Sequence, residues 1–154
     1  MVFDLHLDTE TVGHMDLPMP LCVKPDVAVR EVFAQLKETN RGSVSVCRDD
    51  KLVGIFTERD AFSLMATGGD LDVPVESVMT HQPASVLATD TIRSAIEKMS
   101  VGGYRRLPVL DAAGRPVGLL KVSAILHYLV EHFPAFVYNL PPRPKQAVQQ
   151  REGA

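Results

Sequence analysis

The sequence lacks several features that would place a protein in a specialised class. It has no tryptophan, and aromatic residues make up only 6% of its 154 residues. No apolar run approaches the roughly 18 residues that a membrane span requires. Positive charge is not in excess, because 16 Lys and Arg residues face 19 Asp and Glu residues, a formal net charge of −3. We therefore expect neither a membrane-spanning protein nor one that grips nucleic acid through a basic face.

Cysteine is also scarce, since only Cys22 and Cys47 are present. The first eight residues include acidic side chains and no basic region ahead of an apolar stretch, so we expect no secretion signal. The expected compartment is then the reducing cytoplasm, with both cysteines as free thiols in strands. The apolar content of 45%, with 23% charged residues, favours a folded core over intrinsic disorder. At this length we expect one domain, or two small halves that share a core.

The sequence offers no recognisable catalytic or metal-binding motif. It contains neither a P-loop nor Gly-x-Gly-x-x-Gly, and no Ser/His/Asp or Cys/His arrangement has a familiar local frame. The histidines never occur at i, i+3 or i, i+4 spacing, so we expect them at the surface rather than on a metal or as general bases. They are His6, His14, His81, His127 and His132. We therefore expect a protein that is not an enzyme and has no metal site.

An internal duplication dominates what the sequence does contain. Shifting the chain by 63 residues places Val29 on Ile92 and keeps the apolar positions in phase throughout. One extra residue near Gly114 restores the phase for the last part of the copy. The short lead-in of residues 11–15 likewise mirrors residues 74–78. We expect an N-terminal extension (1–10), two repeats (11–70 and 71–133) and a proline-rich tail (134–154) whose end, from about residue 143, is disordered.

Each repeat shows the pattern β-α-β-β-α, which predicts an α/β fold of the α+β type. Short extended segments are expected at residues 21–23 and 84–86, each followed by a helix with one apolar face. These helices should begin near Asp26 and near Thr89 or Asp90, and end at Asn40 or Gly42 and at Gly102–Gly103. Strands are expected at 43–47, 52–56, 107–110 and 116–120, and closing helices at 58–66 and 123–133. We expect the two sheets to pack on each other as one core, because neither half is large enough to be stable alone.

Two short motifs in this repeat are similar to those of a known family. Residues 54–60, Gly-Ile-Phe-Thr-Glu-Arg-Asp, contain Gly, two apolar residues, Thr, any two residues and Asp. Residues 107–111, Leu-Pro-Val-Leu-Asp, place Pro-Val between apolar residues and end on Asp. In their order and spacing, the two repeats resemble a tandem pair of CBS domains, a Bateman module, in the form of a small stand-alone bacterial-type protein. The resemblance implies two repeats packed through their sheets with pseudo-twofold symmetry, and pairing into disc-like homodimers.

The resemblance also implies a ligand sensor rather than a catalyst. Such pairs commonly bind AMP, ADP, ATP, S-adenosylmethionine or NAD in clefts between the repeats. By this correspondence Thr57 would face phosphate or ribose, and Asp60 would accept the ribose hydroxyls, as a carboxylate can. The positions that match base and phosphate contacts are Ala84, Ser85, Tyr104, Arg105, Arg106 and Leu107, of which the arginines suit phosphate oxygens.

Thr57 and Asp60 also allow a purely structural interpretation. Thr-x-x-Asp at a helix start is close to a capping box, which satisfies backbone N–H groups without any ligand. In the second repeat Lys121 and Ala124 occupy these positions, although a helix is expected there too. A structural requirement should appear in both repeats, so the asymmetry favours ligand contact. The cluster of Tyr104, Arg105 and Arg106 has a simple alternative as well, a solvated loop.

The same asymmetry predicts a weaker second cleft. Without a carboxylate at Ala124 a ribose loses its main anchor there, while Lys121 could attract phosphate or fill the cleft itself. The second-cleft candidates are Cys22, Arg41, Gly42, Ser43 and Lys121. The sequence thus favours a regulatory module that binds an adenine nucleotide in one cleft, forms a homodimer and signals to a protein partner. The alternative is a ligand-free scaffold for dimerisation and protein interaction.

Overall fold

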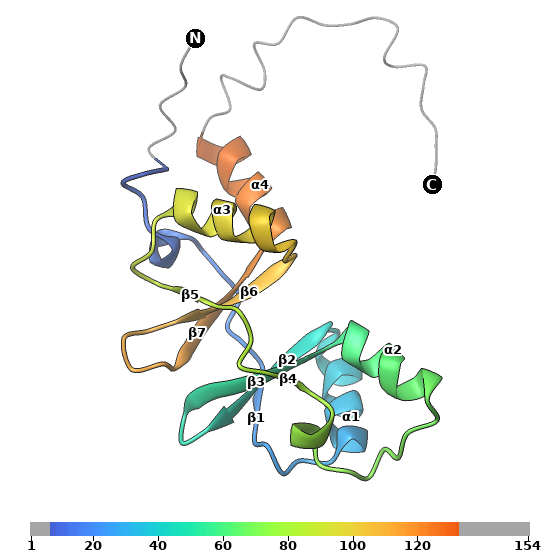
Figure 1. Cartoon of the computed structure of the whole chain (residues 1–154). Coiled ribbons are helices and arrows are strands. Elements are labelled where there is room, and N and C mark those ends of the chain that lie inside the picture. Colours follow the sequence, from blue (N-terminus) through green and yellow to red (C-terminus); the bar gives the residue numbers. More distant parts are fainter. Residues whose placement is uncertain (1–6, 133–154) are drawn as a thin grey trace, which may run out of the picture.

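Both halves of the chain fold as β-α-β-β-α, as predicted. The computed structural model describes residues 7–132 (Figure 1). The first repeat contains β1 (Cys22–Val23), α1 (Val29–Thr39), β2 (Ser43–Arg48), β3 (Lys51–Thr57) and α2 (Glu58–Ala66). The second contains β5 (Val86–Leu87), α3 (Ile92–Gly102), β6 (Arg106–Leu110), β7 (Pro116–Lys121) and α4 (Val122–His132). Two short 3-10 helices, η1 (Val12–His14) and η2 (Val75–Ser77), and the strand β4 (Thr80–His81) lie in the connecting segments.

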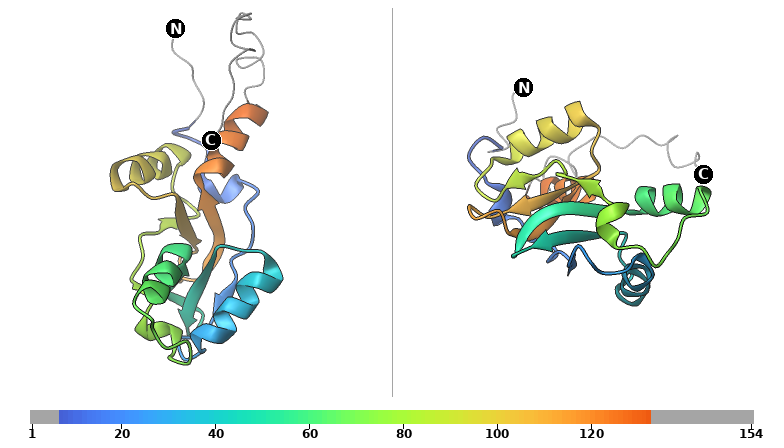
Figure 2. Two further views of the ribbon diagram at one scale, coloured as in Figure 1. Left: turned by 90° about the vertical axis from the view of Figure 1, so that its right-hand side faces the viewer. Right: turned by 60° about the horizontal axis from the view of Figure 1, so that its bottom comes forward.

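Each repeat has its own sheet, and the two sheets share one topology. The strand orders are β1-β2-β3-β4 and β5-β6-β7, with the first strand parallel and the third antiparallel to the middle one. The sequence did not predict β4, which pairs only Thr80 and His81 with β3. Figures 1 and 2 show the second sheet with α3 and α4 in one half of the molecule and the first sheet with α1 and α2 in the other.

The lead-in segments of the two repeats are exchanged. The backbone N–H of Val12, in η1, donates to the carbonyl of Asp90 in the second repeat at 2.9 Å. At the equivalent position 63 residues on, the N–H of Val75 in η2 donates to the carbonyl of Val27 in the first repeat at 2.8 Å. Each segment that enters one repeat therefore binds the other. The two bonds occupy equivalent positions in the two repeats, as pseudo-twofold symmetry requires.

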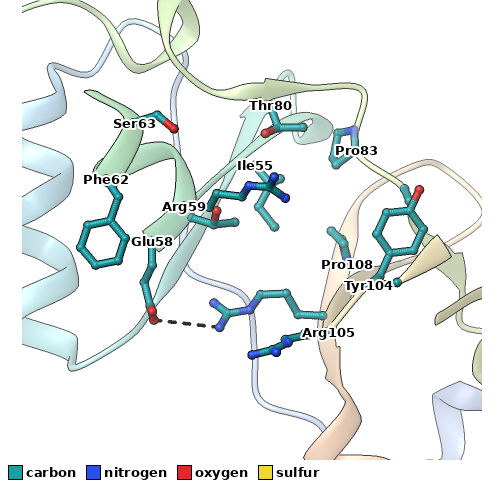
Figure 3. Close-up of a pocket in the computed structure, with 14 residues that line it drawn as sticks. Ile55, Glu58, Arg59, Phe62, Ser63, Thr80, Pro83, Tyr104, Arg105 and Pro108 are labelled. Atoms are coloured by element: carbon teal, nitrogen blue, oxygen red, sulfur yellow. Dashed lines mark ion pairs between the residues drawn. The ribbon is translucent and has the colours of Figure 1, made fainter. Parts of the chain in front are cut away.

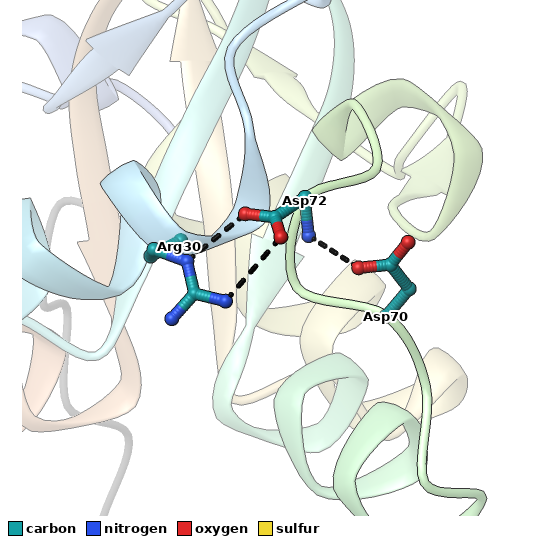
Figure 4. Close-up of polar contacts among 3 residues, drawn as sticks. All are labelled: Arg30, Asp70 and Asp72. Atoms are coloured by element: carbon teal, nitrogen blue, oxygen red, sulfur yellow. Dashed lines mark hydrogen bonds and ion pairs between the residues drawn. The ribbon is translucent and has the colours of Figure 1, made fainter.

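An ion pair marks the edge of this exchange (Figure 4). Arg30, on α1, donates from Nε to Oδ1 of Asp72 at 2.9 Å, and the Asp72 N–H donates to Oδ1 of Asp70 at 2.8 Å. The hydrogen bond and charge of Arg30 lower the pKa of the Asp72 carboxyl. Arg93, on α3, makes the equivalent ion pair with Asp8. All four side chains are exposed, so these pairs orient the segments more than they stabilise the fold.

The hydrophobic core is divided by repeat, which differs from the single core that we expected. One large cluster includes Phe56, Val32 and Val75, and the other includes Leu107, Leu120 and Val12. A smaller third cluster is formed by Leu7, Ile92 and Tyr128. The division arises because each sheet is covered on one face by its own helices. Val12 and Val75 come from the exchanged segments, so each large cluster is completed by the lead-in of the other repeat.

A smaller buried layer lies on the opposite faces of the two sheets. Side chains alternate along a strand, so Ile55 faces away from the cluster that contains Phe56, and yet it is buried. Ile55 lies opposite the buried Ser45, and the equivalent pair in the second sheet, Pro108 and Leu119, is buried as well. This layer accords with packing of the two repeats through their sheets.

The two long helices begin at other residues than the sequence predicted. Helix α1 follows Ala28, not Asp26, and α3 follows Thr91, whose Oγ1 accepts from the Ser94 N–H at 3.1 Å, rather than Thr89 or Asp90. In both helices an exchanged segment accepts from the first helical N–H, Val73 from Val29 and Glu10 from Ile92, each at 3.0 Å. In α1, whose cap residue Ala28 has no polar side chain, the carbonyl of Leu71 also accepts from the N–H of Arg30 at 2.8 Å. The predicted ends are confirmed, with Asn40 and Gly103 in the left-handed region at φ 54° and 70°.

Other predictions are not tested by this structure. The predicted end of the last helix at Phe133, the tail of residues 134–154 and most of the N-terminal extension lie outside the described residues. The exact repeat boundaries and the cytoplasmic location stay predictions. Within residues 7–132 no helix combines the length and the apolar character required to cross a membrane.

Candidate functional site

A cavity of about 630 Å³ opens between the two repeats (Figure 3). One wall comes from the end of β3 and the first two turns of α2, and the other from the loop between α3 and β6. The segment that follows β4 closes one side. The lining residues are Ile55, Thr57, Glu58, Arg59, Phe62, Ser63, Thr80, Pro83, Ala84, Gly103, Tyr104, Arg105, Arg106 and Pro108. A ligand in this cavity, which we call the cleft, would contact both repeats.

The local fold directs these side chains into the cleft. The chain passes from strand into helix at Thr57, so the first turn of α2 stands at the cleft wall. On the other side Gly103 ends α3 in a left-handed conformation and turns the chain toward β6. The N–H of Glu58 donates to the carbonyl of Gly42 at 3.2 Å, and the N–H of Val122 donates to that of Arg105 at 3.1 Å. The two walls are thus built by equivalent bonds of the duplicated fold.

The charge of the cleft suits an anion. Arg59, Arg105 and Arg106 line it, against a single carboxylate, Glu58. Oε1 of Glu58 lies 4.0 Å from Nη2 of Arg106, which is only 28% exposed and links the second repeat to the first (Figure 3). A guanidinium presents a planar fork of donors that matches the oxygens of a phosphate. The cleft can therefore hold a phosphate group through arginines of both repeats.

Apolar side chains form a surface beside this charge, and the hydroxyl-bearing Thr57, Ser63 and Thr80 also line the cleft. Phe62 on α2 is 73% exposed, and Tyr104 faces the cleft from the opposite wall. Between them lie the half-buried Pro83 and the buried Ile55 and Pro108, which form the floor of the cleft (Figure 3). Exposed aromatic side chains next to arginines offer stacking surfaces for a flat heterocycle with a phosphate nearby. The arrangement can contact a flat ring and an adjacent phosphate at the same time.

Gly42 shapes the wall at the ion pair. A Cβ atom at this position would lie 2.2 Å from Oε1 of Glu58 and 3.1 Å from Nη1 of Arg106. A larger residue here would push the flexible ends of Glu58 and Arg106 out of their present positions. Gly42, predicted for the second cleft, therefore also supports the first.

Five of the eight residues predicted for the main site line the cleft, and three do not. Thr57, Ala84, Tyr104, Arg105 and Arg106 belong to its walls. Leu107 is 0% exposed and packs in the second core cluster, so its side chain offers no surface to a ligand. Ser85 lies beside the cleft, where its carbonyl accepts from Nζ of Lys98. The third absentee is Asp60.

Asp60 is held by hydrogen bonds within the protein. Its Oδ2 accepts from the Thr57 N–H at 2.9 Å and lies 3.3 Å from the Thr57 hydroxyl, while its Oδ1 accepts from the Thr80 hydroxyl at 3.0 Å. This is the helix-start arrangement that we considered as the structural alternative. Thr57 and Thr80 both line the cleft, so Asp60 positions two of its residues. A ribose contact by Asp60 stays a prediction, because each carboxylate oxygen retains acceptor capacity.

The residues predicted for the second cleft do not share one cavity. Lys121 lies in a hollow of about 350 Å³ with Arg105, Arg106, Val122 and Ser123, next to the main cleft. Cys22 lines a separate cavity with Cys47. The Arg41 guanidinium donates to the carbonyl of Met19, and Ser43 is buried. Whether a ligand occupies the Lys121 side stays a prediction.

Sequence reasoning missed several residues of the cleft. Arg59 and Phe62 follow the Thr57 position on α2, and Thr80 and Pro83 come from the connection that forms β4. Arg59 occupies one of the two positions of the motif at which any residue is allowed, so the motif does not point to it. Phe62 falls outside the apolar face of its helix, and an aromatic residue in such a position was the available signal.

The sequence profile of the CBS domain matches residues 12–67 and 75–131, which together span most of the chain. The chain belongs to the CBS domain family. It carries two copies, as the duplication and the exchanged fold indicate. The fold class and the tandem arrangement predicted from the sequence are confirmed.

Individual relatives extend this result. An uncharacterised 17.7 kDa protein of Acidianus ambivalens is 33% identical over 110 residues, covering 71% of this chain and 66% of that protein. The solved CBS domain protein PAE2072 of Pyrobaculum aerophilum, complexed with AMP, is 25% identical with a TM-score of 0.69, covering 79% of this chain and 98% of that one. The structure of CBSX2 in complex with AMP is also 25% identical, with a TM-score of 0.70 and coverages of 79% and 97%.

The chain spans from about a fifth to about two thirds of the length of the first curated relatives that it matches. The shared part is the CBS pair.

Proposed function

We propose that this CBS pair is a regulatory module that binds an adenine nucleotide of the AMP, ADP or ATP class in the cleft between its repeats. The observation that carries the proposal is the cleft itself, in which three arginines lie beside an apolar surface that includes two exposed aromatic rings. Two structures of similar fold hold AMP. The nucleotide would be a ligand and not a cofactor of catalysis.

Signalling follows from the position of the cleft. Suppose that the two repeats can pack against each other in two arrangements. A ligand that contacts both repeats shifts the equilibrium between these arrangements only by the difference in its affinity for them. The cleft joins α2 of one repeat to the α3–β6 loop of the other, so occupancy would bias how these elements sit. The altered position of the repeats would change the surface at which the chain contacts a second copy of itself or a regulated protein.

A panel of nucleotides in a thermal-shift experiment tests the proposal. A ligand at about 100 times its dissociation constant stabilises the folded state by about 2.7 kcal/mol. For a chain of this size the melting temperature should rise by about 5–10 °C with AMP, ADP or ATP. GMP and inorganic phosphate serve as controls for base and phosphate recognition. If no adenosine compound, S-adenosylmethionine and NAD included, shifts the melt, the sensor proposal is wrong.

A ligand-free scaffold is the second candidate, and the internal bonding of Asp60 favours it. In this structure the carboxylate predicted to grip ribose serves Thr57 and Thr80. A scaffold would form a stable homodimer, as measured by light scattering. Its melting temperature would not change with any nucleotide of the panel. The same panel therefore separates the two candidates.

The role of Asp60 can be tested by combining two changes: removal of the Asp60 carboxylate from the protein and removal of the ribose hydroxyls from the ligand. Asp60→Ala is expected to lower the stability of the unliganded protein by about 1 kcal/mol, because it removes the partner of the Thr57 N–H. If Asp60 binds ribose, 2′,3′-dideoxy-AMP should bind wild type more weakly than AMP does, whereas Asp60→Ala should not distinguish the two.

Titration calorimetry with both nucleotides measures this difference. Asp70→Ala is the matched control, since Asp70 is an exposed carboxylate that also accepts a backbone N–H, away from the cleft. Equal discrimination against the dideoxy compound by wild type and Asp60→Ala would leave Asp60 with a positioning role only.

A further inference from the structure

A second cavity, of about 610 Å³, brings together the two cysteines of the chain. It is lined by β1, the segment that follows it, the turn between β2 and β3, and Glu76 of η2. Cys22 pairs with Ser45 in the parallel β1–β2 ladder, and Cys47 stands two residues further along β2, after an irregularity that follows Val46. The two thiols therefore lie on adjacent strands and line the same cavity. The exposed Cys22 and the half-buried Cys47 are both free.

A hydrogen bond between the two thiols makes them chemically unequal. It stabilises the thiolate of Cys22 and lowers its pKa to about 7, even though partial burial and the charge of Asp50 act in the opposite direction. The same bond raises the pKa of Cys47, which keeps its proton as the donor. A lowered pKa favours the thiolate form of Cys22 near neutral pH, and the thiolate is the form that acts as a nucleophile.

The surroundings exclude one use of this pair and select another. Among residues 7–132 no group of three or more His, Cys, Asp or Glu side chains is placed to hold a metal ion. The cavity carries more negative than positive charge, with lining residues Asp26, Asp49, Asp50 and Glu76 against Lys24 and Arg48. Arg48 is moreover paired with Glu76, at 3.0 Å from Nη2 to Oε1. A cationic reagent should therefore enter more readily than an anionic one.

We propose that Cys22 and Cys47 form a thiol–disulfide exchange site that reacts with small cationic disulfides and closes into a disulfide between β1 and β2. The Cys22 thiolate attacks one sulfur of the small disulfide, forms a mixed disulfide and releases the first small thiolate, which takes up a proton. Cys47 then loses its proton to solvent, and its thiolate attacks the Cys22 sulfur and releases the second small thiol. The two protein thiols are oxidised to one disulfide, and the small disulfide is reduced to two thiols.

The expected structural effect is a cross-link around α1. The bond would close the loop from Cys22 to Cys47, and closing such a loop restricts the unfolded chain and raises the melting temperature. It would also fasten the edge strand β1 to the middle strand β2. The nucleotide cleft lies at the other end of β2, next to Gly42, so this site stands independently of the proposed function.

Mass spectrometry under non-reducing conditions tests the proposal. Wild type, Cys22→Ala and Cys47→Ala are treated at pH 7 with cystamine, which is cationic, or with oxidised glutathione, which is anionic. Wild type should lose two hydrogens and retain no adduct, and it should melt at a higher temperature than the reduced protein. Cys47→Ala should retain one adduct on Cys22, and Cys22→Ala should react much more slowly.

Two further measurements connect the result to the cavity. Cystamine should react faster than oxidised glutathione after correction for their intrinsic reactivities on a free cysteine, and added salt should reduce the difference. The rate of Cys22 alkylation by iodoacetamide should rise with pH around a midpoint near 7 in wild type. In Cys47→Ala the midpoint should move up toward the ordinary value of about 8.5, because the donor is lost.

Three outcomes would overturn the proposal. They are stable adducts on both cysteines of wild type, disulfides that form only between molecules, and an alkylation midpoint that is the same in wild type and Cys47→Ala. The first two would show that the thiols cannot reach each other, and the third that Cys47 does not activate Cys22.

Discussion

Replacing Phe56 with alanine is expected to lower the free energy of unfolding by about 3–5 kcal/mol, a large part of what a domain of this size possesses. Phe56 is 0% exposed near the C-terminal end of β3, opposite Val44 of β2. Its ring packs against Phe33 of α1 with 5.9 Å between centroids and a tilt of 47°. The substitution would leave a cavity between sheet and helix that the neighbouring side chains cannot fill. Urea unfolding with an unchanged slope would measure the loss.

The same substitution at Phe62 serves as the control. Phe62 is 73% exposed on α2, so Phe62→Ala should change stability by less than about 0.5 kcal/mol. If Phe56→Ala lowers the free energy of unfolding by less than about 1 kcal/mol, the first core cluster is not a main source of stability.

The exchanged lead-ins make this a test of cooperativity as well. Leu120 occupies the position of Phe56 in the second repeat and is also fully buried. Because Val12 completes the second cluster and Val75 the first, Leu120→Ala and Phe56→Ala should each shift a single unfolding transition of the whole chain. Two separate transitions, each sensitive to only one substitution, would show that the repeats are independent domains.

The secondary structure was predictable because it depends on local patterns. The helical spacing of Val29, Val32 and Leu36 and the short apolar runs of the strands recur in both copies, so each repeat supports the assignment of the other. The division of the core and the helix starts were not predictable. They depend on where the exchanged lead-in segments bind, and a backbone carbonyl such as that of Leu71, which accepts from the N–H of Arg30 at the start of α1, leaves no signature in the sequence.

The candidate site was predictable to the extent that it follows the duplicated framework. Thr57, Tyr104, Arg105 and Arg106 stand where strands meet helices in the repeat, and these junctions form the cleft. The direction of a side chain at such a junction depends on its partners across the chain. Asp60 turns toward Thr80, twenty residues away, and that contact could not be read from the Thr-x-x-Asp spacing alone.

Removing Arg106 should have the largest effect on the proposed nucleotide binding. Arg106→Ala is expected to weaken AMP binding about 10- to 100-fold, because hydrogen bonds to a charged group contribute about 1.5–3 kcal/mol. In the cleft ion pair the Arg106 side chain is 28% exposed and that of Glu58 is 65% exposed, so Arg106 is the better shielded from solvent. Arg106 also lies between the repeats. Binding of adenosine, which has no phosphate, should change little in the same variant. Titration calorimetry with AMP and adenosine measures both.

Arg115→Ala provides the matched control, since Arg115 is an exposed arginine paired with Asp111 at 2.8 Å and is not part of the cleft. It should bind AMP as wild type does. Glu58→Gln should act in the opposite direction to Arg106→Ala and tighten AMP binding, because Glu58 competes with phosphate for the Arg106 guanidinium. AMP affinity that is equal in wild type and Arg106→Ala would contradict the phosphate role of Arg106. Opposite signs in the two variants are expected only if the ligand replaces Glu58 as the partner of Arg106, and this exchange of partners would release α2 of the first repeat from β6 of the second when the nucleotide binds.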